Sequence, residues 1–307
     1  MTSRIISATI NQRVKDASYA VRGSIALRAL ELKNDLKNPK GKPLPFKQTI
    51  FCNIGNPHQL KQKPLSFNRD VLSLMLNPDL KGRCVFPKDV LARARRYNRG
   101  IMGLGSYTES QGIPAVREEV AQSLYDRDGY KSDKDNIFLT NGASDGVRYC
   151  MQVFHRSSQS GFSDSVLAPI PQYPLYSAQT TLMGITLSPY YLDESRNWDC
   201  SVESVIEGVE AARAKGLCVR SVVIINPGNP TGQIMEASSI SAVIAYCRKE
   251  NICIFADEVY QANIWKAGAK FVSFRKVAHD MDAFSGEEPL QLVSFHSISK
   301  VILYSIV

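Results

Sequence analysis

From about residue 100 onward, the sequence alternates short β-branched runs with stretches of helical periodicity. Strands are expected at residues 136–140, 165–168, 185–192, 220–226, 252–256 and 290–295. One helix is expected after Gly142, where Val147, Met151 and Phe154 share a face. A second helix is expected to end at about Met183, and two more are expected at residues 202–215 and 237–249. Pro189 predicts that its strand lies at an edge or is broken. The alternation predicts an α/β fold with a mostly parallel sheet covered by helices on both faces.

The 307 residues correspond to about two domains at roughly 100–200 residues each. Hydrophobic residues make up 44% and charged residues 21%, which excludes a collagen-like or wholly disordered chain. No apolar run approaches the roughly 20 residues of a membrane helix, so no membrane partner is expected. The seven cysteines are scattered and form no CxxC pair, which favours a reducing compartment over disulfides or a metal site. We expect a cytoplasmic protein, with a mitochondrial one as the alternative.

Positive charge is concentrated in the first third of the chain. Residues 1–100 hold 20 Lys and Arg against 6 Asp and Glu, whereas the remainder holds 17 against 23. Such asymmetry can indicate a nucleic-acid binder, and this alternative stays open. However, the basic stretch at residues 93–99 lacks the interleaved aromatic residues of a base-stacking surface. Solvated helix faces are the simpler interpretation, and no nucleic-acid partner is expected.

Chemistry-bearing residues directly follow four of the expected strands. These segments read NGASDG (141–146), NPGNPTG (226–232), ADEVY (256–260) and SFHSISK (294–300). Each alone is an ordinary cap, turn or loop start. Because ligands of parallel sheets gather beyond the carboxyl ends of the strands, the four segments are expected to meet at one edge.

Together these segments supply what pyridoxal 5′-phosphate requires. A lysine must hold the aldehyde as a Schiff base, and a carboxylate must keep the pyridine nitrogen protonated. The phenolate oxygen needs neutral donors, and the phosphate needs backbone N–H groups and hydroxyls at a helix start. The residues that fit these roles in turn are Lys300, Asp257, Asn229 with Tyr260, and Ala143 and Ser144 with Ser297.

The same residues carry a family resemblance. The chain resembles the fold-type I (class I and II) aminotransferases, and within them the alanine aminotransferase branch. The shared motifs are YAVRG (19–23), CNIGNPH (52–58), GSYTESQGIPAVR (105–117), FLTNGAS (138–144), APIPQYPLYSA (168–178), PYYLDE (189–194), INPGNPTGQ (225–233), ADEVYQ (256–261) and VSFHSISK (293–300). NPGNPTG and SISK indicate the superfamily, whereas IPQYPLYSA, CNIGNPH and YYLDE are typical of the alanine branch.

The resemblance implies roles for the residues around the cofactor ring. Lys300 matches the lysine that binds the cofactor, and Asp257 matches the partner of the pyridine nitrogen. Tyr260 and Asn229 match the donors to the phenolate oxygen. Tyr173 matches the aromatic residue that stacks on the ring, although a core tyrosine would satisfy the same pattern.

Further roles concern the phosphate and the substrate. Ala143, Ser144 and Ser297 match the phosphate cup. Tyr107 matches a tyrosine that reaches the phosphate of the neighbouring subunit, which implies a homodimer. Gly55 matches the glycine beside the substrate carboxylate, where a simple turn glycine is the alternative.

The reaction that the resemblance implies is a two-stage amino transfer. L-Alanine would leave as pyruvate, and 2-oxoglutarate would then be converted to L-glutamate. Lys300 would anchor the cofactor and, once displaced by substrate, would move the α-proton as a general base.

The resemblance stops directly after Lys300. The family continues into a glycine-rich stretch with a phosphate-binding arginine, whereas this sequence reads VILYSIV (301–307). The arginine for the substrate carboxylate is also missing, and a lysine would not replace its bidentate contact. We therefore expect residues 1–66 to form an N-terminal arm and part of a small domain, and residues 67–307 an incomplete large domain. The alternative to an active enzyme is a truncated product that binds the cofactor weakly or only dimerises.

Overall fold

The computed structural model describes residues 9–19, 23–38, 41, 43–52, 61–101, 103–156 and 161–301. The chain divides into two compact units. The first unit comprises residues 1–64 and 173–184, and the second comprises residues 65–172 and 185–307. The expected domain boundary after residue 66 falls near the break at residue 64, but its assignment to a small and a large domain stays a prediction.

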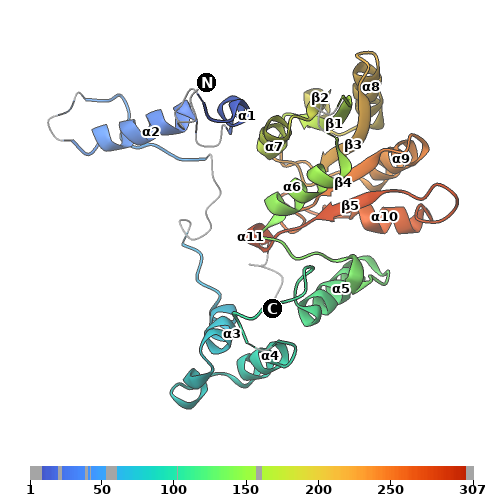
Figure 1. The fold of residues 1–307 in the computed structure, drawn as a ribbon. Coiled ribbons are helices and arrows are strands. Elements are labelled where there is room, and N and C mark those ends of the chain that lie inside the picture. Colours follow the sequence, from blue (N-terminus) through green and yellow to red (C-terminus); the bar gives the residue numbers. More distant parts are fainter. Residues whose placement is uncertain are drawn as a thin grey trace. The chain divides into compact units, whose positions relative to one another are not determined.

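The first unit contains three of the labelled helices in Figure 1, α1 (Gln12–Asp16), α2 (Ser24–Asp35) and α7 (Leu175–Met183). The side chain of Asn11 accepts a hydrogen bond from the Arg13 backbone N–H and so caps α1. Helix α1 packs on α7, where the Arg13 guanidinium donates to the carbonyl of Met183 at 3.0 Å. This contact joins segments that lie 170 residues apart in the sequence.

The second unit is built on a five-stranded parallel sheet (Figure 1). Its strands are β1 (Asp164–Ile170), β2 (Thr186–Tyr191), β3 (Cys218–Ile225), β4 (Cys253–Asp257) and β5 (Leu292–Phe295). Their order is β2-β1-β3-β4-β5, and every neighbouring pair is parallel. The expected parallel sheet is confirmed, and the strand that contains Pro189 lies at an edge as predicted.

Helices cover both faces of this sheet. Helices α8 (Val202–Arg213), α9 (Ala237–Lys249) and α10 (Phe274–Asp280) share one core with inward side chains such as Ile254 and Ala256 of β4. Phe255, between these two residues, points to the opposite face because successive strand residues alternate. There its ring packs on Phe154 of α6 (Ala143–Phe154), whose Val147 and Met151 are fully buried. The prediction of a doubly covered sheet is therefore confirmed.

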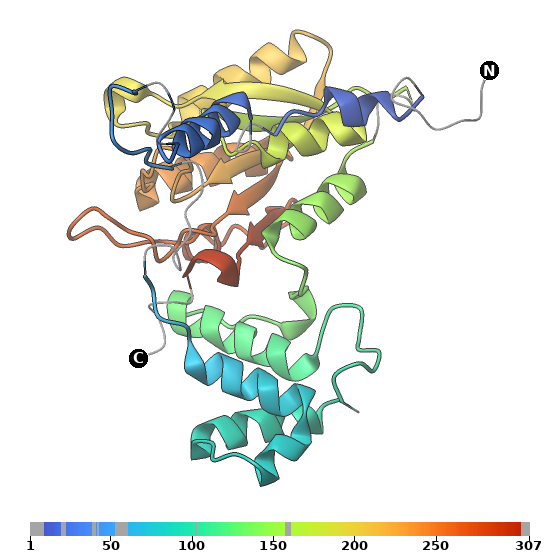
Figure 2. The same cartoon turned by 90° about the vertical axis from the view of Figure 1, so that its left-hand side faces the viewer.

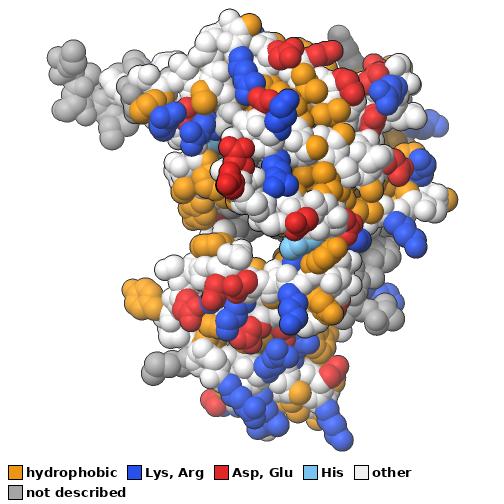
Figure 3. All heavy atoms as spheres, turned by 90° about the vertical axis from the view of Figure 1, so that its right-hand side faces the viewer, with side chains coloured by type: hydrophobic (Ala, Val, Ile, Leu, Met, Phe, Trp, Pro, Cys, Tyr) orange, Lys and Arg blue, Asp and Glu red, His pale blue; other side chains and the backbone are white. Residues whose placement is uncertain are grey.

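A helical subdomain precedes the sheet in the second unit. It contains α3 (Ser66–Leu76), the 3-10 turn η2 (Pro78–Gly82), α4 (Lys88–Arg99) and α5 (Pro114–Asp128). Basic side chains gather over the end formed by α3, η2 and α4 (Figure 3). Arg93 and Arg96 of α4 form ion pairs with Glu119 of α5, so part of the basic stretch is neutralised within the fold. No described helix is both long and apolar enough to cross a membrane.

One expected strand, at residues 136–140, is wrong. A 3-10 turn, η3 (Lys134–Asn136), occupies its start, and residues 137–140 do not join the sheet. The Leu139 N–H instead donates to the Gln111 carbonyl at 2.9 Å, and Phe138 remains 68% exposed. The apolar, β-branched pattern favours an extended backbone, which Ile137 adopts, but a strand also requires a partner strand. None lies beside this segment in the described part of the chain.

Candidate active site

The carboxyl end of β4 places Asp257 in a buried position. All five residues of β4 are buried, and Asp257 is its last residue, with only 5% of its surface exposed. The Asp257 carbonyl accepts a hydrogen bond from the N–H of Asn226, the residue after β3, at 3.0 Å. The N–H of Val259 donates to its carboxylate at 3.4 Å. Asp257 therefore leaves the sheet from a strand that is hydrogen-bonded on both sides.

Two neutral donors meet beside this carboxylate. The Asn229 amide, in the turn after β3, lies 3.4 Å from the Tyr260 hydroxyl, in the turn after β4. Burial, and then the negative charge of Asp257, raise the pKa of Tyr260. The phenol therefore keeps its proton at neutral pH. Both groups can donate to a single oxygen between them, which is what the cofactor's phenolate oxygen requires.

The chain after β5 brings the lysine to the same edge. Phe295 stands opposite Asp257 in the strand register, so the residues that follow it leave the sheet beside Asp257. The Ser297 hydroxyl accepts a hydrogen bond from the Ser299 N–H at 3.2 Å and begins the short helix α11 (Ile298–Val301). Lys300 lies within α11 and is partly buried.

The start of α6 adjoins this end of the sheet. Gly142 precedes the helix with a φ of 82°, and no side chain caps the first N–H groups, which include those of Ala143 and Ser144. A Cβ at Gly146 would lie 3.4 Å from the Phe295 ring, so the first turn sits directly against β5. Figure 2 shows the start of α6 and α11 beside the end of β5. Open N–H groups at a helix start suit an anion such as a phosphate.

Three further residues that the sequence predicts for the site are Tyr173, Tyr107 and Gly55. Tyr173 belongs to the first unit, where its hydroxyl is hydrogen-bonded to that of Tyr19. Tyr107 is fully exposed. Gly55 lies outside the described residues. The roles of all three therefore stay predictions.

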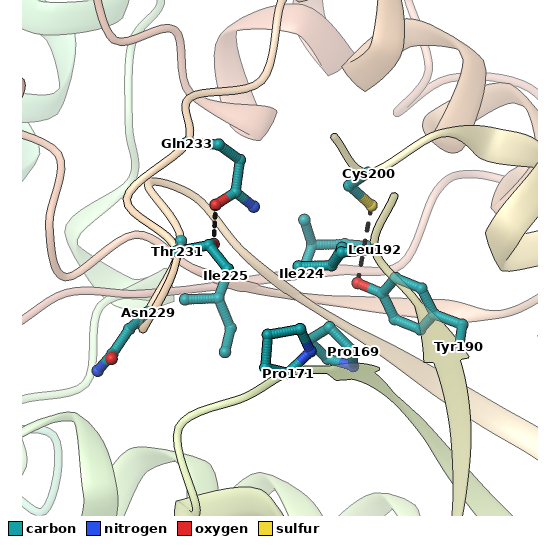
Figure 4. Close-up of a pocket in the computed structure, with 11 residues that line it drawn as sticks. Pro169, Pro171, Tyr190, Leu192, Cys200, Ile224, Ile225, Asn229, Thr231 and Gln233 are labelled. Atoms are coloured by element: carbon teal, nitrogen blue, oxygen red, sulfur yellow. Dashed lines mark hydrogen bonds between the residues drawn. The ribbon is translucent and has the colours of Figure 1, made fainter. Parts of the chain in front are cut away.

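A small cavity behind the NPGNPTG turn is too small to hold a substrate. Its volume is about 10 Å³, which is about the room that one water molecule needs. Apolar side chains such as Pro169 and Ile224 line it, and Tyr190 closes one side while its hydroxyl donates to the Val223 carbonyl at 2.9 Å. The Asn229 amide points away from this cavity (Figure 4). The cavity therefore belongs to the support of the turn.

Sequence reasoning missed the residue that follows Asp257. The sequence predicts a role for Asp257 and none for Glu258, yet Glu258 is only 1% exposed. Its side chain accepts from the Phe274 N–H at 2.8 Å, at the start of α10. The only signal in the sequence was the position of a second acid directly after an apolar run. Its partners lie 131 residues earlier, at Arg127, and 16 residues later.

A sequence profile of the family "Aminotransferase class I and II" matches residues 75–302. The chain belongs to this family. Glutamate–glyoxylate aminotransferase 2 of Arabidopsis thaliana is 46% identical over 297 residues, which cover 95% of this chain and 59% of that protein. Alanine aminotransferase 1, mitochondrial, of the same plant is 44% identical over 298 residues, covering 95% and 54%.

The fold agrees with this assignment. A crystal structure of an aminotransferase from Escherichia coli superposes with a TM-score of 0.67 at 24% identity, covering 97% of this chain and 59% of that one. The chain thus spans somewhat more than half the length of these relatives. Aminotransferases of class I and II use pyridoxal 5′-phosphate, so the cofactor expectation is confirmed at the level of the family. The buried carboxylate, the pair of neutral donors and the open helix start fit that cofactor.

Proposed function

We propose that this chain binds pyridoxal 5′-phosphate at the carboxyl ends of β3, β4 and β5 and catalyses amino transfer. The observation that carries the proposal is the contact of the Asn229 amide with the Tyr260 hydroxyl at 3.4 Å, in turns that flank the buried Asp257. Two donors and a carboxylate in this arrangement match the two polar ends of a pyridoxal ring. Lys300, after the neighbouring strand, supplies the amine.

Each residue then has a distinct task. The bound cofactor supplies an electron sink for the bonds at the substrate α-carbon. Asp257 keeps a proton on the ring nitrogen, while Asn229 and Tyr260 hold the ring in one orientation. The N–H groups of Ala143 and Ser144 and the Ser297 hydroxyl bind the phosphate. The Lys300 amine binds the cofactor and then moves the proton at the substrate α-carbon.

We propose L-alanine and 2-oxoglutarate as the substrates, and pyruvate and L-glutamate as the products. The motifs of the alanine branch and the 44% identity to an alanine aminotransferase support this choice. Glyoxylate is a second candidate acceptor, because a relative that is 46% identical is named for it.

Cofactor binding is tested first. Titrating the purified chain with pyridoxal phosphate should produce the visible absorbance of a lysine-bound aldehyde. Lys300→Ala should abolish this band, whereas Lys270→Ala, a matched change of an exposed lysine, should retain it. A band that survives in Lys300→Ala would contradict the proposed site.

Turnover separates the enzyme from its alternative. Pyruvate formation from L-alanine should be measured with 2-oxoglutarate and, separately, with glyoxylate as the acceptor. Formation with either acceptor that depends on Lys300 supports the enzyme, and the faster acceptor identifies the specificity. A cofactor absorbance band without turnover would instead support the catalytically impaired product. If the chain only dimerises, mixing it with a longer relative should change the rate of pyruvate formation by that relative.

We further propose a homodimer in which Tyr107 reaches the phosphate site of the partner subunit. The full exposure of Tyr107 supports this, because a large aromatic side chain is then available for a second surface. Sedimentation should give a dimer, and Tyr107→Phe should weaken cofactor binding without changing the chain's own fold. A monomeric wild-type chain, together with a cofactor affinity that Tyr107→Phe leaves unchanged, would exclude this arrangement.

We propose the cytoplasm as the compartment, with the mitochondrion as the alternative that a relative's name suggests. All seven cysteines are free, which agrees with a reducing compartment. Cell fractionation with an antibody against the chain distinguishes the two locations.

A further inference from the structure

A buried ionic cluster contacts Glu258, the residue that follows β4. Asp128, at the end of α5, binds the Arg127 guanidinium through two hydrogen bonds of 2.7 Å. It also accepts from Arg275 at 2.9 Å and from the Ser273 hydroxyl at 2.9 Å, at the start of α10. Asp128 and Ser273 are almost fully buried. The cluster therefore joins the end of α5 to the start of α10.

Glu258 connects this cluster to the strand. Its backbone N–H donates to the Phe295 carbonyl at 2.9 Å, which continues the β4–β5 pairing by one residue. One side-chain oxygen accepts from the Phe274 N–H at 2.8 Å, and the other lies 3.9 Å from the Arg127 guanidinium. The peptide that carries Asp257 is thus held from the β5 side and from the α5–α10 side.

Arg127 also contacts the turn that contains Tyr260. Its guanidinium donates to the side-chain oxygen of Gln261 at 3.0 Å, which leaves the amide nitrogen of that residue to donate elsewhere. The amide nitrogen lies 2.9 Å from the Nδ1 atom of His296, the residue before Ser297. The same guanidinium therefore supports the loop after β4 and, through Gln261, the loop after β5.

We propose that Glu258 is a positioning residue, which with Arg127 holds the end of β4 so that Asp257 is aligned with the cofactor's ring nitrogen. This inference rests on the proposed function, because it assigns Glu258 a task in the same site. Glu258 does not touch the cofactor itself. It acts through the strand end that it shares with Asp257.

The charge of Glu258 provides a signature that a purely structural residue would lack. Burial raises its pKa to about 7, while Arg127 and the Phe274 N–H oppose the shift, and Asp128 and Asp257 reinforce it. As the pH rises through 7, Glu258 gains a negative charge beside Asp257. That charge favours a proton on the ring nitrogen, so cofactor binding should tighten over this interval.

Four variants test the proposal in the full chain, with the cofactor dissociation constant from visible absorbance and the thermal midpoint without cofactor as readouts. Glu258→Leu should raise the dissociation constant about tenfold, because both side-chain anchors are lost. Glu258→Gln retains an acceptor for Phe274 and should raise it by only about threefold. Glu287→Gln, on an exposed loop, is the matched control and should behave as wild type. Asp257→Asn should lose most binding.

If Glu258→Leu does not fold, the pH dependence of the cofactor dissociation constant tests the positioning role. The ratio of the dissociation constants at pH 6 and pH 8 should be about threefold larger for wild type than for Glu258→Gln. Equal ratios, together with wild-type affinity in the folded Glu258 variants, would overturn the positioning role and leave the proposed function intact. Wild-type binding by both Asp257→Asn and Lys300→Ala would instead refute the proposed function.

Discussion

The two principal residues of the proposed site lie at the end of β4 and shortly after β5, and these two strands have different surroundings. β4 has a hydrogen-bonded neighbour on each side, and all its residues are buried. β5 is paired only with β4 among the described residues, and of its four residues only Phe295 is buried. Asp257 is therefore held by a buried strand that is paired on both sides, whereas Lys300 follows a strand at the edge of the described sheet. The comparison indicates that the part of the site that holds Asp257 is preorganised more firmly than the part that holds Lys300.

The largest effect is expected from truncating the core side chain of β4. Phe255→Ala should lower the free energy of unfolding by about 3–5 kcal/mol, because Phe255 is completely buried against α6 and Phe295. Leu292→Ala in β5 should cost only about 1–2 kcal/mol, because Leu292 is partly exposed. Urea unfolding of both variants measures the difference. Equal losses would show that the edge strand is as firmly packed as the central one.

The ionic cluster that contacts Glu258 should give the next effect. Asp128→Ala leaves Arg127 and Arg275 without their shared carboxylate and should destabilise the fold by about 3 kcal/mol. Burial opposes the ionisation of Asp128, but the hydrogen bonds from Arg127, Arg275 and Ser273 outweigh it, so its pKa is lowered. Its stabilising contribution is therefore present above the usual aspartate pKa of about 3.9 and lost as the pH falls below it.

This prediction is checked by unfolding at pH 7 and at pH 3. Wild type should lose part of its stability advantage over Asp128→Ala at the lower pH. An Asp126→Ala variant, in which an exposed acid of the same helix is removed, serves as the control and should be close to wild type at both values. A constant difference between wild type and Asp128→Ala would contradict the assigned ion pairs.

A third prediction uses a histidine that supports β4 but not β5. His155 is buried with its edge toward the Phe255 ring, and its Nε2 atom lies 2.9 Å from the Ser221 hydroxyl. Burial lowers its pKa to about 4. Its folded pKa is below the unfolded value, so its contribution is present above about pH 6.5 and is lost as the pH falls toward 4. Between these limits about 2–3 kcal/mol should be lost.

Hydrogen exchange measured at pH 7 and pH 5, after correction for the intrinsic rates, locates this loss. Protection of the β4 amides should fall, while that of the β5 amides changes less. His155→Gln, which retains a hydrogen-bonding side chain without a titrating ring, should remove most of the pH dependence. Uniform loss over both strands in wild type would argue against a local effect of His155.

The smallest effect on stability is expected at the site itself. Tyr260→Phe removes one hydroxyl whose contact with Asn229 is long, at 3.4 Å, so the free energy of unfolding should change by no more than about 0.5 kcal/mol. Cofactor affinity should nevertheless fall about tenfold, because one of the two donors to the ring oxygen is lost. Calorimetry and absorbance titration separate these quantities. A stability loss that parallels the loss of affinity would show that Tyr260 is structural.

The central strands could be predicted because their signal is local. Residues 220–226 and 252–256 are continuous apolar runs, and such runs are buried wherever a parallel sheet forms. Residues 136–140 carry a similar run, yet they form no strand, because pairing depends on a neighbour that the run itself does not encode. Local pattern thus predicts the extended conformation more reliably than membership of the sheet.

The candidate site shows the same limit. Asp257, Asn229 and Tyr260 could be expected to lie close together because each comes at or shortly after the end of a strand, and parallel strands end at one edge. The burial of Glu258 could not be predicted, because it depends on Arg127 and on the start of α10, which no local pattern connects to Glu258. The place of Tyr173 relative to the site likewise depends on how two units fit together, which strand spacing does not determine.

The edge position of β5 also has a consequence for the order in which the chain folds and binds its cofactor. The segment that contains α10 separates Asp257 from β5 in the sequence. This segment must close as a loop before Asp257 can pair with Phe295. The β1–β3 and β3–β4 pairings do not involve β5, so the central strands can pair before this closure. During refolding with pyridoxal phosphate present, far-ultraviolet circular dichroism should therefore recover first. The visible absorbance of the cofactor bound to Lys300 should recover later, because it requires that β5 has docked on β4.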